Sequence, residues 1–271
     1  MLKIYQNGEQ FIAENEDIIR QFPLETVFFE ANAKYMPHTD VNNFLLKLTD
    51  GEKFLLAVHN GDYPMVIFGN NELCTELAQK AVELQLSFNK IMGTLPTCEA
   101  FLCKYESLTA ATHKIRYAME LMRCDTLLTN ETCGVEIPTE KDVDELANMM
   151  VTFHEEAMGE TVTLEEKRNE VASNLTSCAI MRCDGHIVSC AFKKRETDYL
   201  ASISGVYTSP QYRGRGYACR IVTFLTKQIM LNGKLPYLFV DKTNPISNHV
   251  YSKIGYTYAI PQYHIDIVSK E

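Results

Sequence analysis

The chain has 271 residues, about twice the length of a typical domain, so two domains are the first expectation. Apolar residues make up 46% of it and charged residues 23%, a composition typical of a folded globular protein rather than a disordered one. No run approaches the roughly 18 apolar residues of a membrane helix. The first twenty residues contain four acidic side chains and no apolar core, so neither a membrane span nor a signal peptide is predicted.

The charge balance is acidic. Lys and Arg number 26 against 35 Asp and Glu, and the net charge of −9 argues against nucleic acid as a partner. The first 133 residues hold 11 basic and 18 acidic residues (net −7), and the rest hold 15 and 17 (net −2). The acidic excess of the first half suits a cationic partner such as a polyamine or an aminoglycoside-like amine, and an ordinary solubilising surface explains it equally well.

The nine cysteines form no Cys-x-x-Cys pair and no cluster with histidines, so no metal site is predicted. Cys178, Cys183 and Cys190 lie among alternating apolar residues, where free cysteine packs as a small hydrophobic side chain. Reduced, structural thiols indicate a cytoplasmic protein.

The first half of the chain contains few clear elements. Two strands at residues 54–58 and 65–68 flank Asn60-Gly61, which is a hairpin signal, and residues 71–86 form an amphipathic helix. A further strand is expected at residues 117–128. A hairpin followed by a helix resembles the pattern of the second half, so a degenerate internal repeat is one interpretation and an unrelated hairpin is the other.

The second half begins after a polar stretch at residues 128–137, which places the domains at 1–130 and 134–271. Capping boxes start two helices, at Thr139 with Asp142 and at Thr163 with Glu166. The pattern then predicts, in chain order, strands at 179–183, 186–195 and 200–208, a helix at 216–231, a strand at 237–240, a helix at 247–253, and strands at 256–260 and 263–268. This order predicts a mixed α/β layer fold.

Residues 206–218 leave a strand, turn at Pro210 and enter a helix. Gly214 and Gly216 allow close backbone approach, so successive N–H groups can point at one anion, and the helix N-terminus adds partial positive charge. Arg213 and Arg215 can pair with further phosphate oxygens. The segment therefore indicates a pyrophosphate cradle, although a tight turn also requires glycine. It matches neither the Gly-x-x-x-x-Gly-Lys loop nor the Gly-x-Gly-x-x-Gly motif of dinucleotide folds.

Residues 241–256 join a strand to a short helix. Asn244, Ser247 and Tyr251 lie three, four and seven apart, so they line one helical face, with Asn248 beside them. Taken alone, the segment also fits an Asn-Pro turn, an N-capped helix and a packed tyrosine.

In this order and spacing, the two segments resemble the GNAT acetyltransferase superfamily. Gln211-Tyr-Arg-Gly-Arg-Gly216 fits its Gln/Arg-x-x-Gly-x-Gly/Ala signature, and 244–256 resembles its later Asn-x-x-Ala…Tyr-x-Lys-x-Gly-Phe element. The chain departs from that element with Ser247 for Ala and Tyr256 for Phe. The resemblance covers residues 134–271. The length and layout also resemble bacterial members that place a degenerate GNAT-like domain, here 1–130, before the active one.

The resemblance implies an acetyl-CoA-dependent N-acetyltransferase that acts on a primary amine of a small molecule or peptide through a ternary complex. Tyr251 would lie by the thioester sulfur as the catalytic acid. The implied acetyl-CoA-binding residues are Val206, Tyr207 and Thr208 along the pantetheine arm, Gln211, Arg213, Gly214, Arg215, Gly216, Tyr217 and Ala218 at the pyrophosphate, and Asn244 and Ser247. Two alternatives stay open: a catalytically silent acyl-CoA-binding regulatory module, and an acyltransferase that uses a longer acyl-CoA.

One expected part is missing from the sequence. Many family members carry a carboxylate general base on the strand before the cradle, and residues 200–208 contain none. His154, Glu155, Glu156 and Glu196 are candidates by position only. The missing carboxylate is what motivates the non-catalytic alternative.

Overall fold

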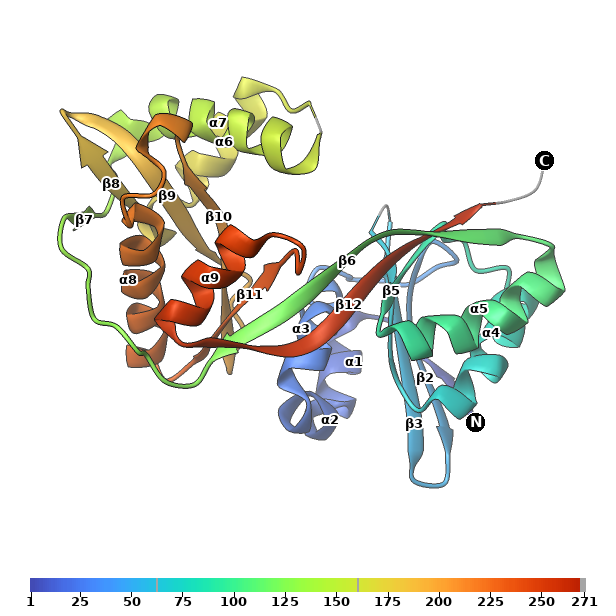
Figure 1. Ribbon diagram of the computed structural model, residues 1–271. Coiled ribbons are helices and arrows are strands. Elements are labelled where there is room, and N and C mark those ends of the chain that lie inside the picture. The colour runs from blue at the N-terminus through green and yellow to red at the C-terminus, as the bar shows by residue number, and fades with distance from the viewer. Residues whose placement is uncertain (62, 160, 269–271) are drawn as a thin grey trace. The chain divides into compact units, whose positions relative to one another are not determined.

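The computed structural model describes residues 1–61, 63–159 and 161–268 (Figure 1). The chain divides into two compact units, which we call unit 1 and unit 2. Unit 1 comprises residues 1–121 together with the segment from residue 259 onward, and unit 2 comprises residues 122–258. These limits differ from the domains 1–130 and 134–271, which rest on the polar stretch at residues 128–137 together with the family resemblance and stay a prediction.

Unit 1 contains the first half of the elements and the end of the last strand. Its elements are β1 (Leu2–Ile4), α1 (Gly8–Glu14), α2 (Glu16–Gln21), α3 (Pro23–Ala33), β2 (Asn43–Asp50), β3 (Lys53–Asn60), β4 (Met65–Gly69), α4 (Cys74–Glu83), β5 (Lys90–Gly93), α5 (Leu95–Thr109) and most of β6 (Thr112–Cys124). The predicted hairpin is β3 and β4, which pair antiparallel from Leu55↔Gly69 to Val58↔Val66. The predicted helix at 71–86 ends at Glu83, and the strand predicted at 117–128 starts earlier, at Thr112.

Unit 2 follows the predicted order closely. Its elements are β7 (Val135–Glu136), α6 (Val143–Met158), α7 (Leu164–Ser173), β8 (Cys178–Cys183), β9 (His186–Lys194), β10 (Leu200–Thr208), α8 (Tyr217–Leu231), β11 (Leu235–Val240), α9 (Pro245–Ile254) and the start of β12 (Tyr256–Val268). Both predicted capping boxes are present, because the side chains of Asp142 and Glu166 accept hydrogen bonds from the backbone N–H of Thr139 (2.7 Å) and Thr163 (2.9 Å).

The two units have the same strand order. Unit 1 runs β1-β2-β3-β4-β5 followed by β12, and unit 2 runs β7-β8-β9-β10-β11 followed by β6, of which only residues 122–124 belong to unit 2. In each, the first four strands pair antiparallel in sequence, and the fourth and fifth are parallel and joined by one helix, α4 or α8. The predicted mixed α/β fold with a second copy in the first half is confirmed at the level of topology.

The sixth strand of unit 1 comes from the second half of the chain. In unit 1, β12 pairs antiparallel with β5 from Tyr263↔Gly93 to Asp266↔Lys90. The prediction of two separate strands at 256–260 and 263–268 is wrong, because β12 is continuous. Pro261 lies between the two predicted strands; its fixed φ is compatible with a strand, and the pairing with β5 begins beyond it, at Tyr263.

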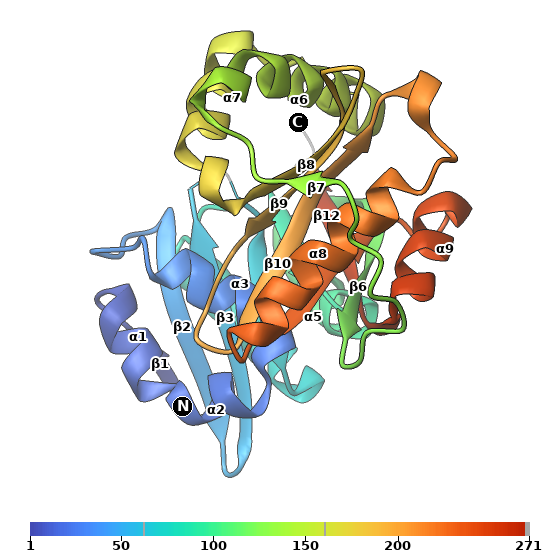
Figure 2. The same cartoon turned by 90° about the vertical axis from the view of Figure 1, so that its left-hand side faces the viewer.

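Alternating side chains of the strands build a core on each face of the sheet. In unit 2, Cys178 and Ile180 face Leu146 and Met149 of α6, together with Val171 of α7. Ala179 and Met181 face the opposite way, toward Ile221, Val222 and Leu225 of α8. Helices α6 and α7 therefore lie on one side of these strands and α8 on the other (Figure 2). In unit 1, α4 and α5 cover one face of the strands and α1 and α3 the other. The period of two along each strand therefore explains the helix–sheet–helix layers.

Two further observations concern the cysteines and the helices of the described residues. All nine cysteines are free, and five of them, Cys74, Cys98, Cys124, Cys178 and Cys190, are buried. Within residues 1–61, 63–159 and 161–268, no helix is long and apolar enough to cross a membrane, and no three His, Cys, Asp or Glu side chains cluster as metal ligands.

Candidate active site

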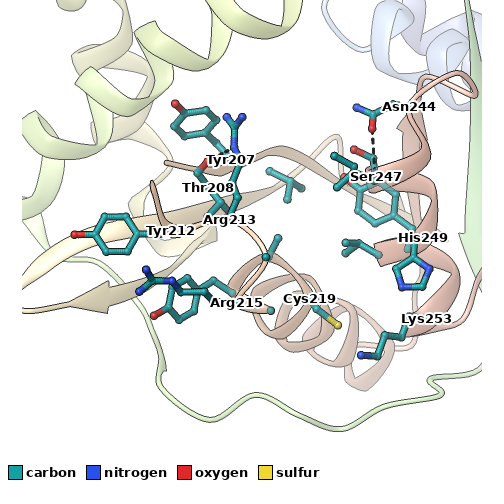
Figure 3. Close-up of a pocket in the computed structure, with 18 of the residues that line it drawn as sticks. Tyr207, Thr208, Tyr212, Arg213, Arg215, Cys219, Asn244, Ser247, His249 and Lys253 are labelled. Atoms are coloured by element: carbon teal, nitrogen blue, oxygen red, sulfur yellow. Dashed lines mark hydrogen bonds between the residues drawn. The ribbon is translucent and has the colours of Figure 1, made fainter. Parts of the chain in front are cut away.

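One cavity of about 900 Å³ lies in unit 2 (Figure 3). Its walls come from the end of α6, the end of β10, the loop that follows, the first turn of α8 and one side of α9. The lining residues are Phe153, Glu156, Val206, Tyr207, Thr208, Tyr212, Arg213, Gly214, Arg215, Gly216, Tyr217, Ala218, Cys219, Asn244, Pro245, Ile246, Ser247, His249, Val250, Tyr251 and Lys253.

The cavity lies where β10 leaves its neighbour. The parallel pairing of β10 with β11 runs from Leu200↔Leu235 to Ser202↔Tyr237, and the cavity-lining residues 206–208 come after it. On its other side, β10 contains a bulge, because the three steps from Ser204 to Tyr207 face only two steps of β9. Gly205 in the bulge has φ +60°, which glycine adopts without strain. A bulge leaves one residue out of the ladder, so this strand can offer backbone N–H and C=O groups to a ligand.

The glycine-containing loop ends in the first turn of α8. Gly214 and Gly216 have φ of +77° and +79°, and a Cβ at either position would meet no protein atom within 4 Å. Glycine is favoured at both positions by the backbone conformation, and the space beside them belongs to the cavity. Gly216 is the N-cap of α8 and has no side chain to satisfy the first N–H groups of the helix. These N–H groups and the helix dipole make the end of the loop suited to an anion.

The two arginines of the loop differ in what they contact. Arg213 donates from a terminal guanidinium nitrogen to the Glu156 carboxylate at 2.6 Å and from Nε to the carbonyl oxygen of Thr208 at 2.9 Å. Its guanidinium also lies over the Tyr207 ring, 5.7 Å from the centroid. Arg215 donates to the carbonyl oxygen of Gln211 at 3.3 Å and lies over Tyr212 at 5.3 Å. In the structure, Arg213 is held by a carboxylate, while Arg215 contacts a backbone oxygen and a ring.

The start of α9 is organised by asparagines. The Asn244 side-chain oxygen accepts a hydrogen bond from the backbone N–H of Ser247 at 3.1 Å, which caps the helix (Figure 3). Asn248 donates to the carbonyl oxygens of Asp241, Lys242 and Asn244. The N-capped helix that the sequence offered as the simpler interpretation is therefore present, and Asn244 lines the cavity as well.

Tyr251 lies one turn further along α9. Its side chain is only 8% exposed, and burial raises the pKa of its phenol to about 12. The ring packs edge to face against Tyr256, with centroids 6.1 Å apart. Because its pKa lies far above neutrality, the Tyr251 hydroxyl keeps its proton at physiological pH.

The four residues considered as general bases lie in different surroundings. Glu156 lines the cavity, and His154, Glu155 and Glu196 do not. Glu196 pairs with Lys193 and Lys234, at 2.7 and 3.0 Å. The Nε2 atom of His154 lies 3.2 Å from Lys167 Nζ, and its Nδ1 lies 3.0 Å from the Met150 carbonyl oxygen, so both ring nitrogens are engaged within the protein.

Glu156 is not poised as a base in this state. The hydrogen bond from Arg213 lowers the pKa of its carboxyl, and the hydroxyl of Tyr207 donates to its other oxygen at 3.1 Å.

The structure brings together all but one of the residues that the family resemblance assigned. Gln211 does not line the cavity, since its side chain is exposed and its carbonyl oxygen accepts from Arg215. The cavity also contains side chains that the sequence did not indicate: Phe153, Tyr212, Cys219, Ile246, His249, Val250 and Lys253. His249 and Lys253 follow Pro245 at intervals of four, so the helical period was the signal that could have found them.

Comparisons with known proteins agree with this architecture. Residues 183–265, which include the glycine-containing loop and α9, match the model of a family described as FR47-like protein. No curated protein gives a significant sequence match.

Three solved structures resemble the whole chain. A GNAT-family acetyltransferase from Colwellia psychrerythraea is 14% identical, with TM-score 0.63 over 100% of both chains. A GCN5-related N-acetyltransferase from Sphaerobacter thermophilus is 15% identical, with TM-score 0.63 over 99% of this chain and 96% of its own. A Drosophila protein is 12% identical, with TM-score 0.65 over 100% of this chain and 99% of its own. At these identities the likeness is one of fold, and it extends through both units.

The predicted resemblance is thereby confirmed. The chain has the fold of GNAT acetyltransferases throughout its length, and residues 183–265 around the cavity match the FR47-like family model.

Proposed function

We propose that the protein transfers the acetyl group of acetyl-CoA to a primary amine of a small molecule or peptide by direct attack in a ternary complex. The observation that carries the proposal is the convergence, in one cavity, of the loop 213–218 with the hydroxyl-bearing residue Tyr251 of α9. This is the arrangement expected of a site that holds an acyl-CoA by its phosphates at one end and its thioester at the other.

The residues present fit acetyl-CoA. The first N–H groups of α8 and the adjacent Arg215 would hold the pyrophosphate, and the open space beside Gly214 and Gly216 lets phosphate oxygens approach the backbone. The end of β10, beyond its pairing with β11, would present backbone groups to the pantetheine arm. When bound, acetyl-CoA supplies the activated acetyl group.

Two events in the acetyl transfer need help from the protein: deprotonation of the amine and the development of negative charge on the carbonyl oxygen. A primary amine has a pKa near ~10, so a proton must leave before the nitrogen can attack. Negative charge then develops on the carbonyl oxygen, and a backbone N–H in the bulge at 204–207 is suited to stabilise it. Holding both reactants in one cavity supplies a further part of the acceleration.

Tyr251 would act on the leaving group. Its pKa of about 12 keeps the phenol protonated throughout the working range, so it can donate to the sulfur as the carbon–sulfur bond breaks. No covalent enzyme intermediate is required. Cys219 lies in the first turn of α8, next to the N–H groups proposed to hold the pyrophosphate.

The proposal is tested by calorimetric titration of the protein with acetyl-CoA, followed by an assay of CoA thiol release against a panel of primary amines. We expect micromolar binding and amine-dependent release. Arg215→Gln should weaken binding several-fold, and more so at low salt, because it removes a cation at the phosphates. The matched control is Arg220→Gln, which removes the same charge from α8 at a residue outside the cavity lining that pairs with Glu131 at 3.6 Å.

Two results would contradict the proposal. No binding of acetyl-CoA by the folded protein would leave only a shared fold. Tight binding without release for any amine would favour the second candidate, a regulatory module that binds acyl-CoA, which the ion-paired state of Glu156 also supports.

A further inference from the structure

Glu156 and Arg213 form an ion pair between the two sides of the cavity in unit 2. Glu156 lies near the end of α6, and Arg213 lies directly before the glycines of the loop. The pair spans 2.6 Å, and both side chains are partly exposed, at 38% for Glu156 and 52% for Arg213. The cation that precedes the anion-binding loop is thus already neutralised by a carboxylate of the protein.

The same guanidinium has two competing acidic partners once a CoA phosphate enters the cavity. A pyrophosphate carries more negative charge than one carboxylate, and guanidinium groups bind phosphate oxygens with two parallel hydrogen bonds. The ion pair with Glu156 is solvent-accessible, and such exposed pairs contribute little to stability. We therefore expect the phosphates to bind Arg213 more strongly than the Glu156 carboxylate does.

We propose that Arg213 changes partner when acetyl-CoA binds, leaving Glu156 for the phosphates, and that the freed Glu156 carboxylate receives the ammonium or amine of the acceptor. This inference rests on the proposed function and adds an order of binding to it, in which the acyl-CoA binds before the acceptor. Glu156 then becomes a positioning and specificity-determining residue for a basic acceptor.

The neighbours of Glu156 hold its side chain in place when Arg213 changes partner. The Tyr207 hydroxyl donates to the carboxylate oxygen that Arg213 does not contact, at 3.1 Å, and so holds the side chain when the arginine leaves. Tyr207 is itself fixed, because it is 6% exposed and packs against Phe153 of α6 with centroids 6.1 Å apart. Loss of Arg213 removes the main cause of the low pKa of Glu156, so the carboxyl becomes more basic as the acceptor arrives.

A purely structural role for the ion pair predicts the opposite sign. If Glu156 only anchors Arg213 and thereby the loop, then removing the carboxylate loosens the loop and weakens acetyl-CoA binding. If Glu156 competes with the phosphates, removing it strengthens binding. The two roles are therefore separated by the direction of one change in affinity.

The experiment is a calorimetric titration with acetyl-CoA of the wild type, Glu156→Gln and Glu155→Gln. Glu155 is exposed, adjacent on α6 and outside the cavity lining, so its variant controls for the loss of one negative charge. We expect Glu156→Gln to bind acetyl-CoA about two- to five-fold more tightly than the wild type, and Glu155→Gln to bind like the wild type. In an Arg213→Gln background, Glu156→Gln should change the affinity by less than it does alone, because the exchange needs the guanidinium.

A second measurement does not depend on affinity. The carboxyl ¹³C signal of Glu156, assigned from its absence in Glu156→Gln, is titrated with and without saturating CoA. We expect the pKa of this carboxyl to rise when CoA is present, with Tyr207 and Arg213 as the groups that set it in the free protein. An unchanged pKa, or weaker acetyl-CoA binding by Glu156→Gln, would overturn the exchange. Absence of binding by the wild type would instead overturn the proposed function.

Discussion

The phenol of Tyr256 donates a hydrogen bond to Thr226 Oγ1 at 2.8 Å, because that hydroxyl already donates its own proton to the carbonyl oxygen of Val222. Tyr256 is 2% exposed, and Tyr251 packs edge to face against it. The two tyrosines share one core but differ in what their hydroxyls do, which makes them a matched pair for separating stability from activity.

Tyr251→Phe should lower kcat by about 10²-fold with little change in acetyl-CoA affinity or in the free energy of unfolding, because it removes only the proposed acid. Tyr256→Phe should cost about 1 kcal/mol of stability, since it leaves the Thr226 hydroxyl without its donor, and should not change kcat. Steady-state kinetics and urea unfolding of both variants check this. Equal activity of Tyr251→Phe and wild type at every pH would remove its role.

Gly216 has a counterpart outside the cavity that shares its backbone conformation. Gly216 and Gly233 have φ of +79° and +73°, and a Cβ added at either residue would meet no protein atom within 4 Å. Alanine at either residue should therefore cost about 1–2 kcal/mol of stability. Only Gly216→Ala should weaken acetyl-CoA binding, because its methyl group enters the cavity at the start of α8. Calorimetry on both variants tests the difference, and a comparable loss of affinity in Gly233→Ala would point to a general loss of structure.

Cys219 offers a footprint for the phosphate end of the cavity. It lines the cavity, whereas Cys103 and Cys133 are exposed thiols elsewhere. Saturating acetyl-CoA should slow alkylation of Cys219 by iodoacetamide and leave the rates at Cys103 and Cys133 unchanged. Peptide mass spectrometry over a time course measures all three thiols in one sample. Unprotected Cys219 in protein shown to be saturated would place the phosphates elsewhere.

Glu170 should make part of the stability of unit 2 dependent on pH. Burial alone would raise the pKa of this carboxyl, but the hydrogen bonds and charges of Lys167 and Lys194 outweigh burial and lower it to about 2. Its contribution is therefore complete above the unfolded-state pKa of about 4.3 and is lost as the pH falls from there toward about 2. Because the side chain is 38% exposed, we expect only about 1 kcal/mol from it.

The check on Glu170 is urea unfolding of the wild type and Glu170→Gln between pH 2 and pH 7. The variant should be less stable than the wild type at pH 7, and the difference should shrink below about pH 4.3. Glu165→Gln, on the same helix, is the control. A difference that stays constant down to pH 2 would show that the low pKa is not present in solution.

Unit 2 was largely predictable because its elements carry local signals. Local motifs fix the backbone of a few neighbouring residues, so they can be recognised without knowledge of the tertiary structure. In unit 2 these motifs are the capping boxes at Thr139 and Thr163 and the glycines before α8. The cavity followed from the spacing of 206–218 and 244–256, which are distant in sequence but joined by a short parallel pairing.

Unit 1 and the finer features of the site were not predictable in the same way. The strands β2 and β5 are buried on both faces, which gives apolar runs without clear periodicity. Continuity of β12 through Pro261 is a tertiary property of the sheet. The contact of Glu156 with Arg213 joins residues 57 positions apart, and no local sequence pattern indicates which carboxylate an arginine will bind.

The pairing of β12 with β5 affects the order of folding during synthesis. Gly93 in β5 pairs with Tyr263 in β12, so the sheet of unit 1 is incomplete until nearly all of the described chain has left the ribosome. Until then, the edge of β5 is a row of unpaired backbone groups of the kind that favours association between nascent chains. The sheet of unit 1 can therefore be completed only after residues 263–266 have been synthesised.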